Sequence, residues 1–359
     1  MIPWIKGLKA VGVTVDVVSI YAGKTESYQE ITPRVLGVSR LSRMLIKVGC
    51  RLLKMSEFNS TLYFGFPSIR KLRKEIASIA PGISVIRPPL SMFGIIVSCL
   101  SLMRRSKIIF YTQGNLFEKQ YSRKNQKIID GLISVFRAVW ITPVLGDTKG
   151  RKKHDKMYYF PFAMEVKNDS PRQSVKQILC VGKFEQRKNH HLLLQAISGL
   201  KEQYAFHVKL VGEVSSKEHE QYMQSICRMI DQLGLQKHVS VLTNIPFVKM
   251  HELYEEADLF VLPSANESAS VSQLEAMAFG CPVICSDDNG TRFYVEPEKT
   301  GYWMKKNDPE DLTRCLEALL SDPEKVQQFS KNCLETLKEV HDPVVLGHKL
   351  LEIAQGGKR

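Results

Sequence analysis

Short apolar runs, rich in β-branched residues, alternate with stretches of helical periodicity along nearly the whole chain of 359 residues. Several of these runs are continuously apolar, as expected for parallel strands that are covered on both faces. Helical patterns lie between the runs, for example at residues 190–200 and 216–234. The alternation predicts an α/β fold with doubly wound parallel sheets. We expect strands at residues 13–20, 107–113, 138–144, 177–182, 207–212, 239–242, 258–264 and 282–287.

A polar stretch with two prolines, residues 161–176, separates two such α/β halves. We expect an N-terminal domain at residues 1–165, on the acceptor side, and a C-terminal domain at residues 166–340. Residues 341–359 belong to a last helical segment, from about 324 to 353, that could cross back to the N-terminal domain. A cleft between two α/β units is a natural place to bring two substrates together.

The beginning of the chain departs from the usual order of a doubly wound domain, in which a strand and a glycine-bearing turn precede the first helix. Here the sequence opens with IPWIKGLKAVG, which has a helical pattern. We therefore expect the N-terminal domain to lack its first strand and turn. A misassigned start site, a truncated gene and a lost element all remain open as explanations. A loss of this kind could leave an inactive remnant that still binds nucleotide.

Charge separates the two halves of the chain. Residues 1–165 contain 27 Lys and Arg against 10 Asp and Glu, whereas residues 166–359 contain 23 against 27. The basic half predicts an anionic partner, such as acidic lipid headgroups, a phosphorylated acceptor or nucleic acid. Nucleic acid is the least favoured, because no stripe of basic and aromatic residues accompanies the charge. The alternative is a lysine-rich solvated surface without a partner.

The eight cysteines form no CxxC pair, and most lie in apolar runs. We expect free, buried thiols in a reducing compartment and no metal site.

The first 20 residues carry no secretory signal pattern. The most apolar segment, residues 91–103, is too short to span a bilayer. We interpret it as a buried helix, with a helix at a membrane surface as the alternative, because Arg104, Arg105 and Lys107 follow it. The expected location is the cytoplasm, including the inner face of the cell membrane.

The motif richest in chemistry is PSANESASVSQLEAMAFGCPVICSD, residues 263–287. It predicts a strand end, a polar loop that carries Glu267, and a helix that carries Glu275. Ligands bind at this edge of open α/β sheets, and the N–H groups at a helix start suit a diphosphate. Three amides would face that diphosphate, those of Ser270, Val271 and Ser272. The alternative is a capping box, in which Glu275 only accepts the N–H of Ser272.

A second motif, CVGKFEQRKNHHLLLQA, occupies residues 180–196. A buried strand leads to Gly182, which permits close approach of a ligand to the backbone. Lys183, Arg187 and Lys188 follow, and two or three cations there could neutralise two phosphates. A basic surface loop is the alternative for this motif alone. The two motifs lie about 80 residues apart in one α/β half, which favours a shared ligand.

Residues 177–320 resemble the donor domain of the GT-B glycosyltransferases of family 4, the large retaining group, also called group 1. The acid-x7-acid motif that continues as EAMA-G-PV-I-S-D, residues 267–287, carries the specific part of the resemblance. The glycine and lysines of the second motif are similar to the family's phosphate-binding pattern. The resemblance implies two Rossmann-like doubly wound domains that face a cleft.

The resemblance also implies roles for individual residues. Lys183 and Lys188 would hold the donor diphosphate next to Gly182, and Glu275 would bind the ribose. Glu267 would contact hydroxyls of the transferred sugar. The catalytic candidates are therefore Glu267, Lys188 and Lys183. No metal and no cofactor are required, because the lysines supply the positive charge and the nucleotide-sugar is itself a substrate.

Three departures from the family pattern affect these expectations. Lys183 replaces an arginine and loses the bidentate fork of that side chain. Ala269 and Ser270 stand where an aromatic residue and a glycine are common, so the sugar pocket can differ. Gln113 lies near the position of a family histidine on the acceptor side and cannot act as a base.

The leading hypothesis is a hexosyltransferase that uses a UDP- or GDP-sugar. Its acceptor would be a saccharide or a polyprenyl-linked lipid in surface polysaccharide or glycan biosynthesis. One alternative is a nucleotide-sugar 2-epimerase of the same fold, which would release free UDP and an altered sugar. A nucleic-acid-binding protein is a further alternative, suggested by charge alone.

Overall fold

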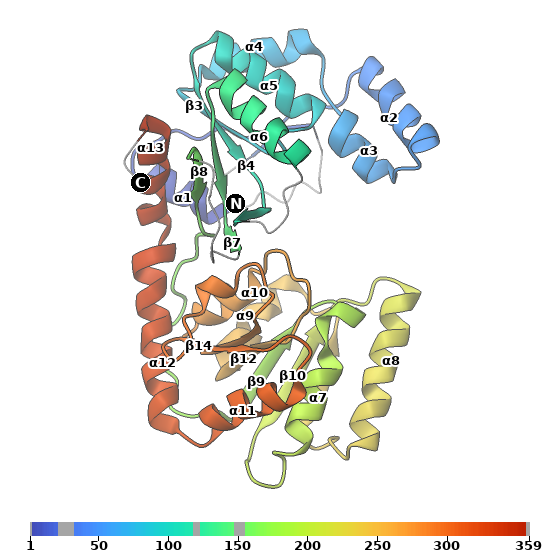
Figure 1. Ribbon diagram of the computed structural model, residues 1–359, viewed down its shortest axis with the longest axis vertical. Helices are drawn as coiled ribbons and strands as arrows, with labels where there is room; N and C mark the ends of the chain where they lie inside the picture. The colour runs from blue at the N-terminus through green and yellow to red at the C-terminus, as the bar shows by residue number, and fades with distance from the viewer. Residues whose placement is uncertain (1, 21–31, 118–122, 147–154, 357–359) are drawn as a thin grey trace. The chain divides into compact units, whose positions relative to one another are not determined.

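The computed structural model describes residues 2–20, 32–117, 123–146 and 155–356. The chain forms two compact units (Figure 1). Unit 1 comprises Met1–Pro161 and Pro343–Arg359, and unit 2 comprises Phe162–Asp342. The chain therefore leaves unit 1 after Pro161 and returns to it for its last helix.

Unit 2 is built on a six-stranded parallel sheet with the strand order β11-β10-β9-β12-β13-β14. The strands are β9 (Gln177–Val181), β10 (His207–Gly212), β11 (Val239–Thr243), β12 (Leu259–Leu262), β13 (Val283–Ser286) and β14 (Gly301–Met304). The helices are α7 (His190–Ser198), α8 (Lys217–Gln232), α9 (Phe247–Glu256), α10 (Ser272–Met277), α11 (Pro309–Leu320) and α12 (Pro323–Thr336). Two short 3-10 helices, η1 (Gln186–Lys188) and η2 (Arg292–Tyr294), and the π-helix η3 (Leu337–His341) complete the unit.

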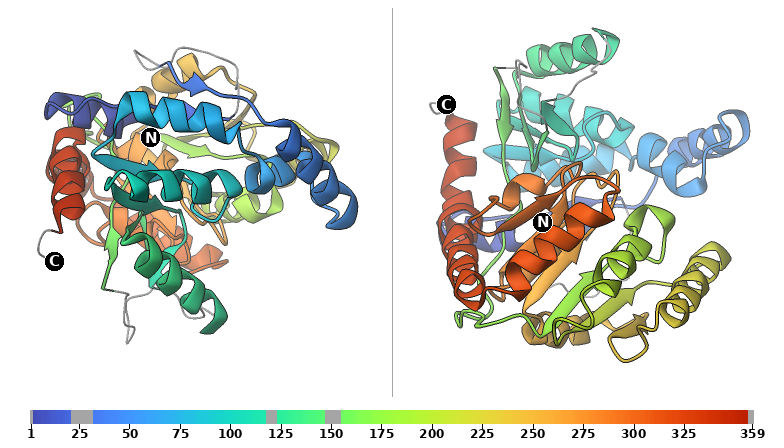
Figure 2. Two further views of the ribbon diagram at one scale, coloured as in Figure 1. Left: turned by 90° about the horizontal axis from the view of Figure 1, so that it is seen from above. Right: turned by 60° about the horizontal axis from the view of Figure 1, so that its bottom comes forward.

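Strand order decides which face of this sheet each helix covers. The chain moves outward from β9 to β10 and β11, and then returns to place β12 on the other side of β9. Because crossovers are right-handed, α7 and α8 cover one face and α9 and α10 the other (Figure 2). β12 and β13 are buried along their whole length, as continuously apolar runs predict.

Unit 1 has a four-stranded parallel sheet of order β3-β4-β6-β8 and two short parallel pairs, β1–β2 and β5–β7. The strands are β1 (Val18–Ser19), β2 (Arg34–Val35), β3 (Ile83–Ile86), β4 (Lys107–Tyr111), β5 (Asn115–Phe117), β6 (Val139–Thr142), β7 (Val144–Gly146) and β8 (Met157–Tyr159). The helices are α1 (Ile2–Ala10), α2 (Arg40–Leu52), α3 (Glu57–Phe64), α4 (Ile69–Ile79), α5 (Met92–Met103), α6 (Arg123–Phe136) and α13 (Pro343–Gln355).

Successive residues of β4 point to opposite faces of the unit 1 sheet, as the pleat requires. Phe110 packs edge-on against Phe136 of α6 on one face, with 6.0 Å between ring centroids. Tyr111 packs against Trp4 of α1 on the other face, at 5.0 Å. Helix α13 lies beside α1, so the first and last helices cover this face together.

The predicted α/β fold with parallel sheets is confirmed, and seven of the eight predicted strands lie where they were expected. The prediction at residues 13–20 is wrong, because only Val18–Ser19 forms a strand, and it pairs with two residues of β2 outside the main sheet. The chain opens with α1, as predicted, and the four-stranded sheet of the described residues starts at β3.

Two predicted helices differ from expectation. Helix α5 buries Gly94, Ser98 and Ser101, while Met103 and other large apolar side chains are exposed, so the prediction of a buried helix is wrong for its outer face. The segment predicted as helical from about 324 to 353 is interrupted at Asp342, which is extended before Pro343. A proline disfavours helical geometry at the residue before it. The helical segment therefore ends at Asp342, and a new helix starts at Pro343.

Close contact between α1 and α13 gives a test of the packing in unit 1. A methyl group at Gly7 would lie 1.7 Å from the carbonyl oxygen of Pro343. Gly7→Ala is therefore expected to push the helices apart and to lower the free energy of unfolding by about 1–3 kcal/mol. Thermal unfolding followed by circular dichroism measures the change.

The matched control is Gly131→Ala in the middle of α6, where a methyl group would meet no atom within 4 Å. This variant is expected to be more stable by about 0.5–1 kcal/mol, because alanine restricts the unfolded chain. A Gly7→Ala protein that melts at or above the wild-type temperature would contradict the close packing.

Candidate functional site

Strands β9 and β12 lie next to each other at the middle of the unit 2 sheet, although they are far apart in sequence. They pair in parallel, with Leu259 opposite Ile178 and Phe260 opposite Leu179. Their carboxyl ends therefore open at the same edge. Strand order reverses between these two strands, and ligands of open α/β sheets bind at such switch points. The two motifs singled out in the sequence are the loops that follow them.

Hydrogen bonds fix these two loops to each other. The Ala265 N–H donates to the carbonyl of Arg187 (2.8 Å). The buried Asn189 side chain donates to the carbonyl of Pro263 (3.0 Å) and to Asn307 Oδ1 (2.9 Å). Asn189 has a positive φ of 54°, a conformation that asparagine tolerates well. The side chains that the loops carry are therefore held at a defined separation.

An ion cluster joins the loops at this edge. One carboxylate oxygen of Glu267 accepts from Lys188 Nζ (2.5 Å) and from Arg187 Nη1 (2.8 Å). The side chains of Lys188 and Glu267 are only 11% and 12% exposed, which strengthens their attraction. A Cβ atom at Gly182 would lie 3.1–3.4 Å from carbons of Lys188, so the lysine stem covers this glycine. The structure thus brings Gly182, Lys188 and Glu267 together.

Arg187 was expected only as one of several cations that could face the phosphates, and the sequence prediction gave it no specific role. Its place in a basic run next to Lys188 was the available signal, but nothing in the sequence indicated that it contacts Glu267. Lys183 lies outside the cluster and pairs with Glu213 (3.2 Å) just after β10. Both of those side chains are about half exposed, and such pairs contribute little to stability.

Glu275 has a different partner from Glu267. Its carboxylate accepts from the hydroxyl of Tyr254 on α9 (2.8 Å). The N-cap of α10 is Val271, without a side-chain capping bond, so the capping-box alternative is wrong. Burial raises the pKa of Glu275, against the opposite effect of the Tyr254 hydrogen bond. Glu275 and Glu267 therefore belong to two separate hydrogen-bonded groups.

A buried polar network supports the loop between the two glutamates. Gln273 Nε2 donates to the Thr291 carbonyl (2.5 Å), and Asn289 Nδ2 donates to Gln273 Oε1 (2.7 Å). The Ser270 N–H donates to the hydroxyl of Thr291 (3.0 Å). The Ser270 amide is therefore engaged within the protein, contrary to its predicted place in a phosphate cradle. Val271 and Ser272 remain the candidate amide donors.

The acceptor-side candidate, Gln113, follows β4 in unit 1. Its side-chain oxygen accepts from Arg87 Nη2 (3.2 Å), whose guanidinium also lies over the ring of Tyr111 at 5.2 Å. Gln113 is thus held by a cation, and its role stays a prediction.

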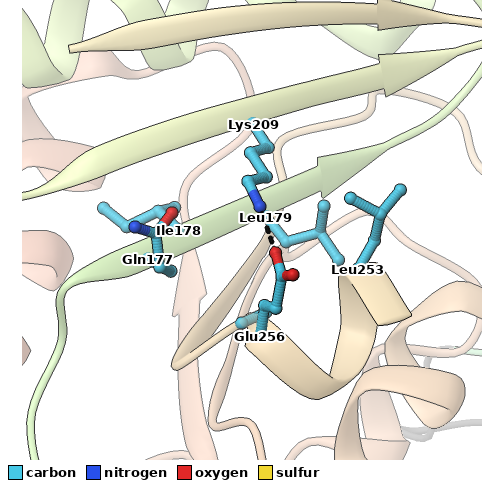
Figure 3. A pocket seen from close by; sticks show the side chains of 7 residues that line it. Gln177, Ile178, Leu179, Lys209, Leu253 and Glu256 are labelled. Carbon is cyan, nitrogen blue, oxygen red and sulfur yellow. Dashed lines mark hydrogen bonds and ion pairs between the residues drawn. The ribbon is translucent and has the colours of Figure 1, made fainter. Parts of the chain in front are cut away.

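A shallow hollow lies at the opposite edge of the unit 2 sheet (Figure 3). It is lined by residues from the amino end of β9 and from the end of α9, and an ion pair between Lys209 and Glu256 crosses it. Because β9 runs from Gln177 to Val181, this hollow and the ion cluster lie at opposite ends of the strand. The hollow therefore forms no part of the candidate site.

All eight cysteines are free, and five of them are buried. Among the described residues, no three His, Cys, Asp or Glu side chains are grouped so that they could hold a metal ion. In the same part of the chain, no helix combines the length and the apolar character that a membrane crossing requires.

The match to a family model covers most of unit 2. Residues 165–335 match the model described as "Glycosyl transferases group 1". This segment is a group 1 glycosyltransferase domain. A D-inositol 3-phosphate glycosyltransferase of Corynebacterium urealyticum is 33% identical over 152 residues, which are 42% of this chain and 36% of that relative.

Another relative is named for lipopolysaccharide core biosynthesis. A lipopolysaccharide core biosynthesis mannosyltransferase, LpcC of Rhizobium leguminosarum, is 26% identical over 159 residues, or 44% of this chain and 45% of the relative. The chain spans about a third to a half of the length of the curated relatives it matches.

Solved structures show the fold of the whole chain. The crystal structure of a glycosyltransferase from Rickettsia africae has a TM-score of 0.75 at 16% identity, and the match covers 99% of this chain and 93% of that one. HepE from Anabaena, solved in complex with UDP-glucose, has a TM-score of 0.69 at 14% identity, with 99% and 95% covered. The fold is therefore GT-B, with a glycosyltransferase domain in unit 2 and a second Rossmann-like unit.

The raised pKa of Glu275 gives a test within the glycosyltransferase domain. The folded protein holds this proton more tightly than the unfolded chain, so stability falls as pH rises above the ordinary carboxyl value of 4.5 toward the raised pKa. Glu275→Gln keeps an acceptor for Tyr254 and removes the titration. The stability of the variant relative to wild type should therefore increase from about pH 4 to about pH 7.

Urea unfolding at a series of pH values measures this difference. Glu255→Gln on α9 removes an exposed carboxylate and serves as the matched control for the loss of one charge. A relative stability of Glu275→Gln that stays constant or falls over this range would contradict the buried position of Glu275.

Proposed function

We propose that the protein transfers a hexose or a related sugar from a UDP- or GDP-sugar, with retention of anomeric configuration. The acceptor in this proposal is a saccharide or a polyprenyl-linked lipid in surface polysaccharide or glycan biosynthesis. The observation that carries the proposal is the cluster of Lys188, Arg187 and Glu267 at the switch point of a group 1 glycosyltransferase domain.

The cations of the cluster suit the leaving group of such a reaction. When the bond between sugar and diphosphate breaks, the nucleoside diphosphate gains negative charge. Fixed cations near that charge lower the barrier, because they need no reorganisation during the reaction. Lys188 is the main candidate, with Arg187 beside it in the cluster. Lys183, which pairs with Glu213 outside the cluster in the free protein, is a further candidate, and the amides of Val271 and Ser272 would add hydrogen bonds.

The carboxylates suit the hydroxyls of the donor. Glu267 would accept from hydroxyls of the transferred sugar, and Glu275 would accept from the ribose. In the free protein both carboxylates have protein partners, so binding exchanges these partners for ligand groups. Lys188 would exchange its contact with Glu267 for one with the diphosphate. Glu267 would exchange its contact with Lys188 for hydrogen bonds from the sugar hydroxyls.

Further features of the proposal follow from the same residues and from the relatives. The lysines would supply the positive charge that a metal ion gives in other transferases, so the reaction would need no metal. Relatives named for lipopolysaccharide core and colanic acid synthesis support a polysaccharide acceptor, and HepE, solved with UDP, supports a nucleotide-sugar donor. The basic unit 1 suits an acceptor or lipid with negative charge, at the inner face of the cell membrane.

Substitution of the cluster tests the assignment. Lys188→Met and Glu267→Gln are each expected to lower kcat/KM for transfer by about 10²–10³-fold, because each removes one electrostatic contact to the transition state. The assay supplies a panel of UDP- and GDP-sugars with oligosaccharide and polyprenyl phosphate acceptors, and mass spectrometry identifies the product.

The matched control is Lys209→Met, which also removes a lysine paired with a glutamate but lies at the other sheet edge. It should leave transfer unchanged. Full activity of both cluster variants would remove the site assignment. A free, altered sugar without an acceptor-linked product would show the 2-epimerase instead.

Binding of the donor nucleotide gives an independent test. A ligand that binds the folded state alone stabilises it by about 2.7 kcal/mol at a concentration 100-fold above Kd. UDP or GDP should therefore raise the melting temperature, and Lys188→Met should reduce that rise. If neither nucleotide raises it, the proposed donor is wrong.

A further inference from the structure

The surface of helix α2 in unit 1 combines exposed apolar side chains with cations. Its outward apolar residues are Leu41, Met44, Val48 and Leu52, which are 56%, 59%, 41% and 76% exposed. Their spacing of three and four places them along one side of the helix. An ordinary surface helix of a soluble domain presents charged and polar residues on that side.

A line of cations runs beside this apolar line on the same helix. It consists of the exposed residues Arg40, Arg43, Lys47 and Arg51, and the exposed Lys54 follows just beyond the end of the helix. In the sequence, no Asp or Glu lies between Arg34 and Lys54. We call the two lines together the α2 face.

The inner side of α2 shows why the large apolar residues point outward. It carries the buried residues Ser42, Ile46 and Gly49. Gly49 is close to Ser60 of α3, where an added Cβ would lie 2.3 Å from the serine hydroxyl. That hydroxyl donates to the Ile46 carbonyl (2.7 Å). Small residues thus bring α2 close to α3, and the four exposed apolar side chains lie outside that contact.

The position of α2 among the described residues of unit 1 leaves its face exposed. Helix α2 packs on α3, which packs on α5, and Figure 1 shows α3 between α2 and the rest of the unit. Helix α3 adds two exposed aromatic residues, Phe58 and Tyr63. Helix α4, elsewhere in unit 1, carries four exposed cations, Arg70, Lys71, Arg73 and Lys74.

We propose that the α2 face docks on the surface of an anionic phospholipid bilayer. The helix would lie in the plane of the interface, with the apolar line inserted at the boundary of the acyl chains. The cations would contact the headgroups beside it. Both parts of this arrangement are the known requirements of a helix that binds at a membrane surface. The proposal deepens the membrane association proposed above and is independent of the donor chemistry.

The chemistry of the α2 face favours a bilayer over other occupants. Nucleic acid would contact the cations but would leave Leu41, Met44, Val48 and Leu52 facing phosphates. An apolar groove of a protein would bury these side chains but would offer nothing to five cations in a stretch of sequence without Asp or Glu, unless that protein were itself strongly acidic. An anionic bilayer supplies both an apolar layer for the apolar line and a charged layer for the cations beside it.

Flotation of the full chain with vesicles tests the proposal. The vesicles contain phosphatidylcholine and phosphatidylglycerol in equal parts, or phosphatidylcholine alone. Wild type is expected to float with the anionic vesicles and much less with the neutral ones. Leu41→Ser/Met44→Ser/Leu52→Ser and Arg43→Glu/Lys47→Glu/Arg51→Glu should each lower the partition coefficient by at least about tenfold.

Two matched controls lie in unit 2. Phe247→Ser/Val248→Ser removes the exposed apolar side chains of α9, and Lys217→Glu/Lys237→Glu/Lys249→Glu reverses three exposed cations. Both should bind vesicles as wild type does. Equal losses in the controls, unchanged binding of the α2 variants, or no binding of wild type would each overturn the proposal. A dimer that depends on Leu41, Met44 and Leu52, without vesicle binding, would identify a second copy as the occupant.

A variant with one exposed substitution guards against misfolding. Leu52→Trp places an indole on the apolar line, and brominated acyl chains in anionic vesicles should quench its added fluorescence. An unquenched indole on vesicle-bound protein would also overturn the proposal. UDP or GDP binding is measured on the same variants and should be unchanged, so a failure of membrane docking is distinguished from a failure of the proposed transferase.

Discussion

The pairing of β9 with β12 is the constraint on which the candidate site depends. Lys188 and Glu267 are 79 residues apart in the sequence. They meet because the strands before them are neighbours and run in the same direction. If the chain did not return to β9 after β11, β10 and β11 would lie between β9 and β12, and the two loops would be apart. The strand order therefore determines where the site lies, and the side chains of the two loops determine its chemistry.

The free protein satisfies the charges of this site internally. Glu267 is mostly buried, and burial of an unpaired carboxylate would be costly. Lys188 and Arg187 remove that cost by pairing with it. A ligand that brought only phosphate would take the cations and leave Glu267 without a partner. A ligand that brings phosphate and hydroxyl groups together can satisfy both signs of charge, which favours a sugar phosphate over a simple anion.

Sequence predicted the parts of the fold that rest on local pattern. The buried strands of unit 2 and the two loops after β9 and β12 were found because continuous apolar runs and motif spacing are local signals. Short strands such as β3 and β8 were missed, since three or four half-buried residues give little periodicity. The partners of Glu275, Ser270 and Lys183 could not be predicted, because each lies on another element whose distance in space no spacing reveals.

The packing of α1 against α13 has a consequence for the order in which the molecule is assembled. Gly7 and Pro343 touch across the two helices, although all of unit 2 lies between them in the chain. A ribosome therefore finishes unit 2 while unit 1 still lacks one of its helices. Unit 2 can close on itself during synthesis, whereas the Gly7 side of α1 stays open to water or to a chaperone until α13 emerges.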